Sequence, residues 1–142
     1  MRDCKSKQIK AGILFVILPL LIGGSLYYLL CPNVLFVKRL DALFCINRSA
    51  DTGHKSFLIF FLRNYFFDLL WAFALTNALS LIFNNNARLL LTSVLLSILL
   101  GILMEVLQFV GLAAGTADFY DIAAEAAGAI VGVVIIKNFW RR

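Results

Sequence analysis

The sequence has few charged side chains: Asp, Glu, Lys and Arg make up only 15% of its 142 residues, whereas soluble domains carry about 25%. Hydrophobic residues account for 62%, and the mean hydropathy is +0.92. A water-soluble chain of this length could not bury that much apolar surface in its own core. The scarcity of charge therefore argues against a soluble domain and indicates an integral membrane protein of one domain.

Metal-ligating residues are also scarce. Histidine occurs once, and the three cysteines, Cys4, Cys31 and Cys45, show no C-x-x-C spacing. We therefore expect no metal site and no cofactor, and whether Cys31 and Cys45 pair stays open. The chain also has no Ser/His/Asp set and no phosphate-binding glycine loop. Its net charge of +5 comes with no basic face carrying interleaved aromatics outside the apolar runs, so nucleic acid is not an expected partner.

Long charge-free runs dominate the chain. Residues 11–30 contain no charge over 20 residues, which is enough to cross a hydrocarbon core of about 30 Å. Three further helices are expected at about residues 65–83, 89–110 and 118–136. Residues 31–64 form the outer loop between the first two spans, with an interfacial helix expected through LFVKRLDALF. The sequence thus predicts an all-α membrane protein, a four-transmembrane-helix bundle.

The distribution of positive charge predicts the orientation. The basic N-terminus, residues 1–10, holds four cations against a single acid, Asp3, and the tail at residues 137–142 and Arg88 add further cations on the same side. The segments on the other side hold five cations and the other seven acids. Because cytoplasmic loops carry the excess of Lys and Arg, both termini are expected in the cytoplasm of a multi-pass protein whose surroundings are the lipid bilayer.

Polar residues enter three of the four expected spans at one depth, near the outer boundary. A carboxylate at the centre of a membrane helix costs about 2.5–3.5 kcal/mol, so Glu105 and Glu125 should point into the bundle, pair with Arg63 or another cation, or be protonated. Helix–helix adhesion and favourable charge at a helix N-terminus are the alternative explanation of such groups. The expected polar pocket comprises Arg63, Asn64, Asp68, Glu105, Gln108, Asp118, Asp121 and Glu125.

Small residues recur at four-residue spacing in the fourth span, at Ala124, Gly128 and Gly132. Such a face lets another helix approach closely, and we favour packing within the monomer over dimerisation. Turns are expected at Asn84 to Asn86 and before the fourth span, where Gly115 and Thr116 would supply the turn and the N-cap.

The stretch ILMEVLQFVGLAAGTADFYDIAAEAAGAIVG resembles the VanZ-like family of integral membrane proteins. It carries the E-x-x-Q of that family at Glu105 and Gln108, the D-x-x-D at Asp118 and Asp121, and then a glycine-rich helix with Gly128 and Gly132. Upstream, RNYFFDLLWAFAL is similar to the N-Y-x-x-D-L-L-W entry to the preceding helix and gives Asn64, Asp68 and Trp71. The resemblance covers about residues 60–136.

The chain departs from the family pattern at two places. Many members carry an arginine in the loop before D-x-x-D, where this chain has Gly115 and Thr116, and many carry asparagine at the position of Glu125. Both differences concern the expected pocket, so its chemistry need not be that of other members.

The resemblance implies a role at the bacterial cell envelope, with teicoplanin-type glycopeptide resistance suggested by the family's name, and it implies no particular reaction. The favoured hypothesis is an outer-face acidic pocket that engages an envelope component such as a lipid-linked precursor or a glycopeptide. A membrane enzyme is the second, with Glu105 or Asp121 as general acid or base and other acids holding a divalent metal. An assembly protein that binds a partner through Gly128 and Gly132 is the third. The sequence specifies neither the ligand nor the oligomeric state.

Overall fold

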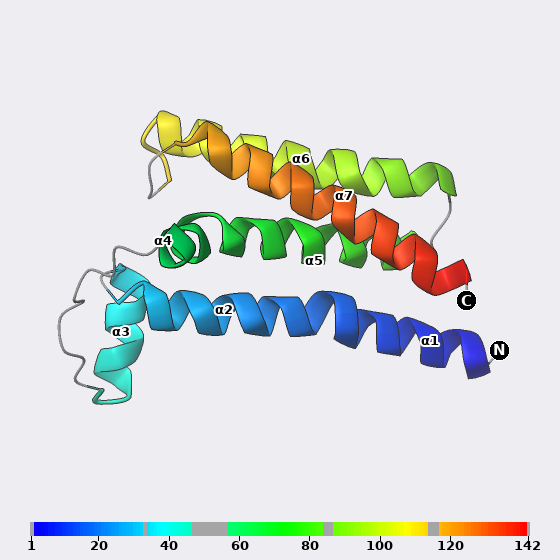
Figure 1. Cartoon of the computed structure of the whole chain (residues 1–142), viewed down its shortest axis with the longest axis horizontal. Coiled ribbons are helices and arrows are strands. Elements are labelled where there is room, and N and C mark those ends of the chain that lie inside the picture. The colour runs from blue at the N-terminus through cyan, green and yellow to red at the C-terminus, as the bar shows by residue number, and fades with distance from the viewer. Residues whose placement is uncertain (1, 33, 47–56, 84–86, 114–116, 142) are drawn as a thin grey trace.

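The computed structural model describes residues 2–32, 34–46, 57–83, 87–113 and 117–141. Every element in these ranges is a helix, and the two chain ends lie at the same end of the molecule (Figure 1). The turns expected at Asn84 to Asn86 and at Gly115 and Thr116 lie outside the described residues. We refer to the two ends of the bundle as the terminal end and the α3 end.

The first rod runs continuously from α1 (Arg2–Gly12) through the π-helical turn η1 (Ile13–Ile17) into α2 (Leu18–Leu30). The Leu18 N–H bonds to the Ile13 carbonyl, five residues back, directly before Pro19. In a regular α-helix the proline ring would collide with the carbonyl four residues earlier, and a wider turn relieves that collision. The helix therefore passes Pro19 unbroken, and it begins well before residue 11.

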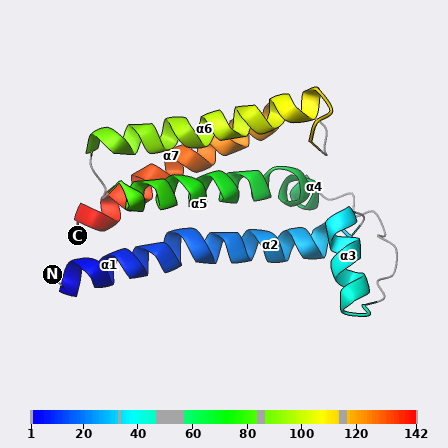
Figure 2. The same cartoon turned by 180° about the vertical axis from the view of Figure 1, so that it is seen from behind.

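Two short helices lie at the α3 end of the bundle. Helix α3 (Leu35–Leu43) lies across the end of α2 (Figures 1 and 2), and the Tyr28 hydroxyl donates a 2.6 Å hydrogen bond to Asp41 that ties the two together. Helix α4 (Phe57–Asn64) falls within the segment assigned above to the outer loop, and it is bent by 42° from α5 (Phe66–Ile82). The second apolar segment is thus longer than the sequence analysis expected, with a break at Tyr65.

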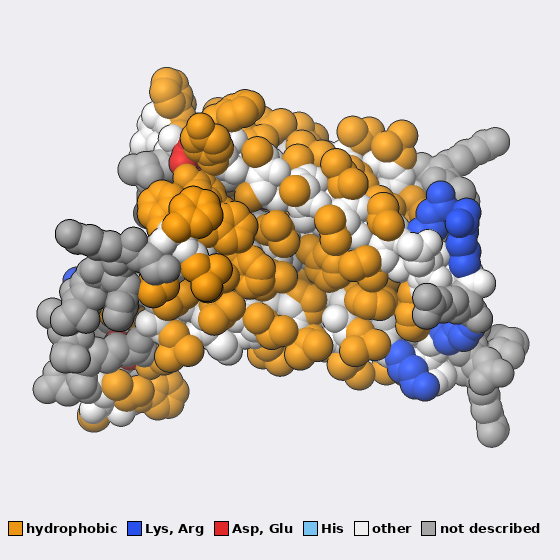
Figure 3. Space-filling model, in the orientation of Figure 1, with side chains coloured by type: hydrophobic (Ala, Val, Ile, Leu, Met, Phe, Trp, Pro, Cys, Tyr) orange, Lys and Arg blue, Asp and Glu red, His pale blue; other side chains and the backbone are white. Residues whose placement is uncertain are grey.

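Helices α6 (Ala87–Phe109) and α7 (Phe119–Arg141) complete the bundle, and α7 packs most extensively on α5. Three helices are long and apolar enough to cross a membrane, Lys5–Leu30, Leu89–Phe109 and Phe119–Arg141, and the bent pair α4 and α5 adds a fourth if it forms one span. The expectation of an all-helical chain with several membrane-length helices is confirmed for the described residues. Hydrophobic side chains cover the visible face between the two ends, with lysines and arginines at the terminal end (Figure 3).

Small and polar side chains line much of the interior of the bundle, beside a small apolar cluster of Ala11, Leu90 and Ile136, while many large apolar ones such as Leu95 and Leu99 face outward. Three buried serine hydroxyls are satisfied: Ser80 and Ser93 donate to carbonyls four residues earlier, and Ser97 donates across to the Ala72 carbonyl at 3.2 Å, whereas the Thr76 hydroxyl has no partner among the described residues. Close approach of three helices then needs no large apolar core. The stripes recur at about four-residue spacing: Asp68, Ala72, Thr76 and Ser80 on α5, Ser93, Ser97, Gly101 and Glu105 on α6, and Glu125, Gly128 and Gly132 on α7.

The glycines of α7 are the points of closest approach to α5. A Cβ at Gly128 would overlap the Leu69 carbonyl oxygen and lie 3.1 Å from the Leu69 Cα. A Cβ at Gly132 would lie 2.9 Å from Asn77 Nδ2 and 3.1 Å from the Phe73 carbonyl oxygen. Helix α5 of the same chain therefore covers the face of α7 at both glycines. Ala124, one turn earlier, is half-buried.

Replacing Gly128 with alanine should push α7 away from the α5 backbone and lower the free energy of unfolding by about 1–3 kcal/mol, the usual range for overpacking. Reversible unfolding in detergent micelles would measure the change. Gly24→Ala is the matched control, because a Cβ at Gly24 would meet no described atom within 4 Å. That variant should keep or gain stability, by up to about 1 kcal/mol, since alanine is the better helix former. Equal behaviour of the two variants would contradict the packing described.

Candidate functional site

Five carboxylates gather at the α3 end of the bundle, and we call them the carboxylate cluster. Asp68 lies in the first turn of α5, and Glu105 lies one turn before the end of α6. Asp118 directly precedes α7, Asp121 lies in its first turn, and Glu125 lies one turn further along. Because α6 runs antiparallel to α5 and α7 runs antiparallel to α6, these five residues come to the same end of the bundle.

The acids of the cluster act on one another electrostatically. Glu125 experiences the charges of Asp68, Glu105 and Asp121, and Asp121 experiences those of Asp68, Glu105 and Asp118. Like charges close enough to interact disfavour simultaneous ionisation, and the effect is stronger where water is scarce. The cluster therefore favours a bound proton, a cation or a hydrogen-bond donor.

Asp118 and Glu105 are engaged in holding the connection between α6 and α7. The Asp118 backbone N–H donates to Glu105 Oε2 at 2.8 Å, which fixes the start of α7 against α6. The Asp118 side chain accepts from the Tyr120 N–H at 3.0 Å, as an N-cap does, and from the Tyr65 hydroxyl at 3.3 Å. Helix capping and inter-helix adhesion thus account for much of what these two acids do.

Glu125 is the member of the cluster that packing does not explain. Its side chain is 7% exposed, and its Oε2 atom has no hydrogen-bond partner among the described residues. The carboxylate fits against the α6 backbone at Gly101, where a Cβ would overlap Oε2 and lie 2.9 Å from Oε1. Thr76 Oγ1, Asn77 Oδ1 and Trp140 Nε1 are also buried without a described partner, but only Glu125 carries an ionisable carboxyl group, whose burial costs most when it is ionised.

The remaining residues of the expected pocket lie at the same end of the bundle, with no described contact to the cluster. Arg63 and Asn64 are exposed in the last turn of α4, and Gln108 is half-buried one turn beyond Glu105. The Cys31 thiol lies 4.0 Å from the Arg63 carbonyl oxygen, which places the end of α4 beside the end of α2. Cys45 is exposed, and no disulfide joins it to Cys31.

No three acidic, histidine or cysteine side chains in the described part of the chain are placed to hold a metal ion together. The acids of the cluster come from α5, α6 and the start of α7. They repel one another, and one hydrogen bond, from the Asp118 backbone N–H to Glu105, joins two of these residues. The geometry therefore gives no support to a divalent-metal centre among the described residues.

The sequence analysis did not single out Gly101 or Tyr65, although both contact the cluster. A signal for Gly101 exists in the sequence, since it stands four residues before Glu105 in the stripe that also holds Ser93 and Ser97. Tyr65 is the tyrosine of the N-Y-x-x-D-L-L-W motif quoted above, but the motif does not indicate its partner Asp118, which is 53 residues away.

No protein-family model matches the chain, and no curated protein or solved structure is similar to it. The resemblance to the VanZ-like family therefore stays a prediction that rests on the motif residues quoted above.

The contact between Gly101 and Glu125 can be tested by a double-mutant cycle. Gly101→Ala alone should lower the free energy of unfolding in detergent by about 1–3 kcal/mol, because the new methyl group displaces the buried carboxylate. In a Glu125→Ala background the same change should cost less, with a coupling energy of about 0.5–3 kcal/mol. Gly24→Ala serves as the control and should behave alike in both backgrounds. Additive effects of Gly101→Ala and Glu125→Ala would show that the two residues do not touch.

Proposed function

We propose that the chain is a VanZ-like protein of the bacterial cell membrane whose carboxylate cluster binds a component of the cell envelope. It crosses the membrane four times, with both termini in the cytoplasm and the cluster on the outer side. Glycopeptide resistance of the teicoplanin type is the phenotype in which this activity is expected.

The connectivity of the helices supports four crossings. Both chain ends lie at one end of the bundle (Figure 1), so the number of crossings must be even if both ends are on one side of the membrane. Treating α4 and α5 as one bent span gives four crossings with α1–α2, α6 and α7. Helix α3, which lies across the end of α2, then rests in the outer interface (Figures 1 and 2).

Charge supports this orientation. The cations of the terminal end whose side chains are described are Lys5, Lys7, Lys10, Lys137 and Arg141, and, apart from Asp3 of α1, every acid in the described ranges lies toward the α3 end. Lysine and arginine are retained on the cytoplasmic side of membrane proteins. The carboxylate cluster consequently faces the outer surface.

The observation that carries the binding proposal is the buried Glu125 carboxylate oxygen without a hydrogen-bond partner among the described residues. An ammonium or a hydroxyl group of a ligand could donate a hydrogen bond to it, and an ammonium would in addition offset the repulsion from Asp68, Glu105 and Asp121. A lipid-linked precursor or a glycopeptide offers groups of both kinds. We therefore favour an envelope ligand that donates hydrogen bonds to the cluster.

The other two interpretations have weaker support. For a membrane enzyme with Glu105 or Asp121 as acid or base, the Glu105 carboxylate already accepts the Asp118 backbone N–H, which leaves Asp121 for that role, and the described acids form no metal centre. For an assembly protein, the face of Gly128 and Gly132 would have to be available, but α5 of the same chain lies against it.

Glu105→Gln and Glu125→Gln test the proposal. Each keeps the size of the side chain, and glutamine at 105 retains an oxygen for the Asp118 N–H, so both proteins should insert and fold normally. Both should abolish the change in teicoplanin susceptibility that expression of the wild-type chain produces, measured as the inhibitory concentration. Lys137→Gln, which removes a charge at the other end of α7, is the control and should keep the phenotype. If correctly inserted Glu105→Gln and Glu125→Gln variants changed teicoplanin susceptibility as much as the wild-type chain does, the proposal would be overturned.

The orientation has a test of its own. In a background with all three native cysteines replaced by serine, a membrane-impermeant maleimide should label Lys38→Cys in intact cells and Lys5→Cys only after lysis. Lys38 and Lys5 are both exposed, at opposite ends of the bundle, so burial does not limit either reaction. The reverse pattern would place the cluster in the cytoplasm.

A further inference from the structure

Acids on three helices surround Glu125. The charges that act on it are those of Asp68 on α5, Glu105 on α6 and Asp121 on α7. Carboxylates that repel one another in a partly buried site inside a membrane are unlikely to be ionised all at once, because each ionised group makes the next ionisation harder. Without a bound cation, the group is therefore expected to retain a proton.

Glu125 is the acid of this group for which ionisation is least favourable. Its side chain is 7% exposed, whereas the three acids that act on it are half-buried. Its Oε2 atom lies against the α6 backbone at Gly101 and has no hydrogen-bond partner among the described residues. Glu105, by contrast, has a donor in the Asp118 backbone N–H at 2.8 Å. An ionised carboxylate without a donor is the most costly to bury, so Glu125 is the best place for the proton.

The surroundings of this buried carboxyl group differ along the bundle. Asp121, one turn nearer the α3 end on α7, is half-buried. In the other direction, Gly128 lies directly against the α5 backbone. Further toward the terminal end, the apolar cluster of Ala11, Leu90 and Ile136 fills the space between the helices. A proton on the buried group therefore exchanges with water on the side of the carboxylate cluster.

Aromatic rings border the cluster on that side. Tyr65 donates its hydroxyl to Asp118, and its ring lies at centroid distances of 6.2 Å from Tyr120 and 5.9 Å from Phe60. Tyr120 is 68% exposed and Phe60 is 53% exposed. The faces of aromatic rings attract organic cations, as carboxylates do. Exposed rings next to repelling acids favour an ammonium group over a neutral hydroxyl group.

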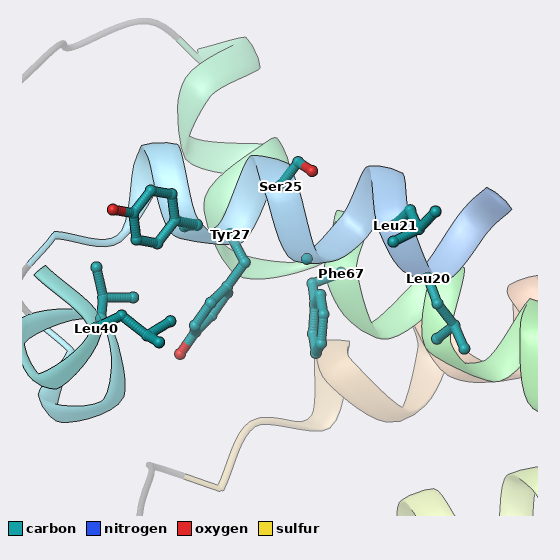
Figure 4. Close-up of a pocket in the computed structure, with 9 residues that line it drawn as sticks. Leu20, Leu21, Ser25, Tyr27, Leu40 and Phe67 are labelled. Carbon is teal, nitrogen blue, oxygen red and sulfur yellow. The ribbon is translucent and has the colours of Figure 1, made fainter. Parts of the chain in front are cut away.

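Helices α2 and α4 also reach this end of the bundle. Figure 4 shows Tyr27 of α2 and Phe67 of α5 side by side, and their ring centroids are 5.2 Å apart. Tyr27 interacts electrostatically with Asp68, the residue after Phe67. Arg63, the cation of α4, is exposed, and the charges that act on Glu125 are those of the acids named above. The group that α2 adds beside the cluster is thus a neutral phenol.

We infer that Glu125 holds a proton in the absence of ligand, and that a primary ammonium group bound among the acids of the cluster displaces this proton to water. The inference rests on the proposed function and names its ligand class, a compound that carries an amine. The exchange is balanced, because one ammonium group enters with its three hydrogens and one proton leaves. A neutral hydroxyl compound brings no positive charge and does not drive it.

The protonation of Glu125 can be observed directly, because the chain contains only two glutamates. Glutamate labelled with ¹³C at the side-chain carboxyl group is incorporated, and solid-state NMR of the protein in bilayers distinguishes carboxylic acids from carboxylates. Glu105→Gln and Glu125→Gln assign the two signals. In sodium chloride at neutral pH, the Glu125 signal should be that of a carboxylic acid.

Methylammonium chloride then replaces sodium chloride at constant ionic strength. It should lower the proton affinity of Glu125 by about ten-fold, because a positive charge now lies among the acids. Glycerol, a hydroxyl donor without charge, should leave the proton in place. The inference would be overturned by an ionised Glu125 in sodium chloride, by a signal that methylammonium does not change, or by an equal effect of glycerol.

Two variants test whether the neighbouring acids act on Glu125. Asp121→Asn removes one repelling charge, so it should lower the proton affinity of Glu125 by about ten-fold in sodium chloride. Asp3→Asn removes the same charge from α1 at the other end of the bundle and should leave that affinity unchanged. Equal effects of the two variants would contradict the inference.

The NMR signal and the teicoplanin phenotype separate the two proposals. A proton on Glu125 that methylammonium displaces, together with a wild-type phenotype in the Glu105→Gln and Glu125→Gln variants, would reject the proposed function alone. An ionised Glu125 in sodium chloride, together with a phenotype that both variants abolish, would reject the proton exchange alone.

Discussion

The contact between the α7 backbone at Gly128 and the α5 backbone at Leu69 is the constraint on which the arrangement of the bundle depends. Within a bilayer, the hydrophobic effect does not draw helices together, so stability comes from close backbone approach and from hydrogen bonds. Glycine at 128 permits that approach and fixes how α7 lies along α5. Glu125, one turn away, is thereby held between the helices at the level of Gly101 and Asp68.

The same constraint explains why the interior contains polar side chains that bond to the backbone of their own helix. Small side chains are needed where helices touch, and serine and threonine are small residues whose hydroxyls can bond to the preceding turn of their own helix. Ser80 and Ser93 do so, and Asn77 donates to the Phe73 carbonyl at 2.7 Å. A glutamate has no such local partner. Glu125 is accordingly the one charged side chain among the described residues that is both fully inside the bundle and lacking a partner for one oxygen.

Hydropathy along the chain is a local property, and it predicted the all-helical class and the long apolar helices correctly. Spacing within single helices also identified the carboxylates that meet at the α3 end. The sequence did not reveal that Gly101 faces Glu125, because the rotation of α6 against α7 depends on contacts between residues 24 positions apart. It did not reveal α4 as a separate helix, since Phe57–Asn64 continues the apolar pattern that follows it.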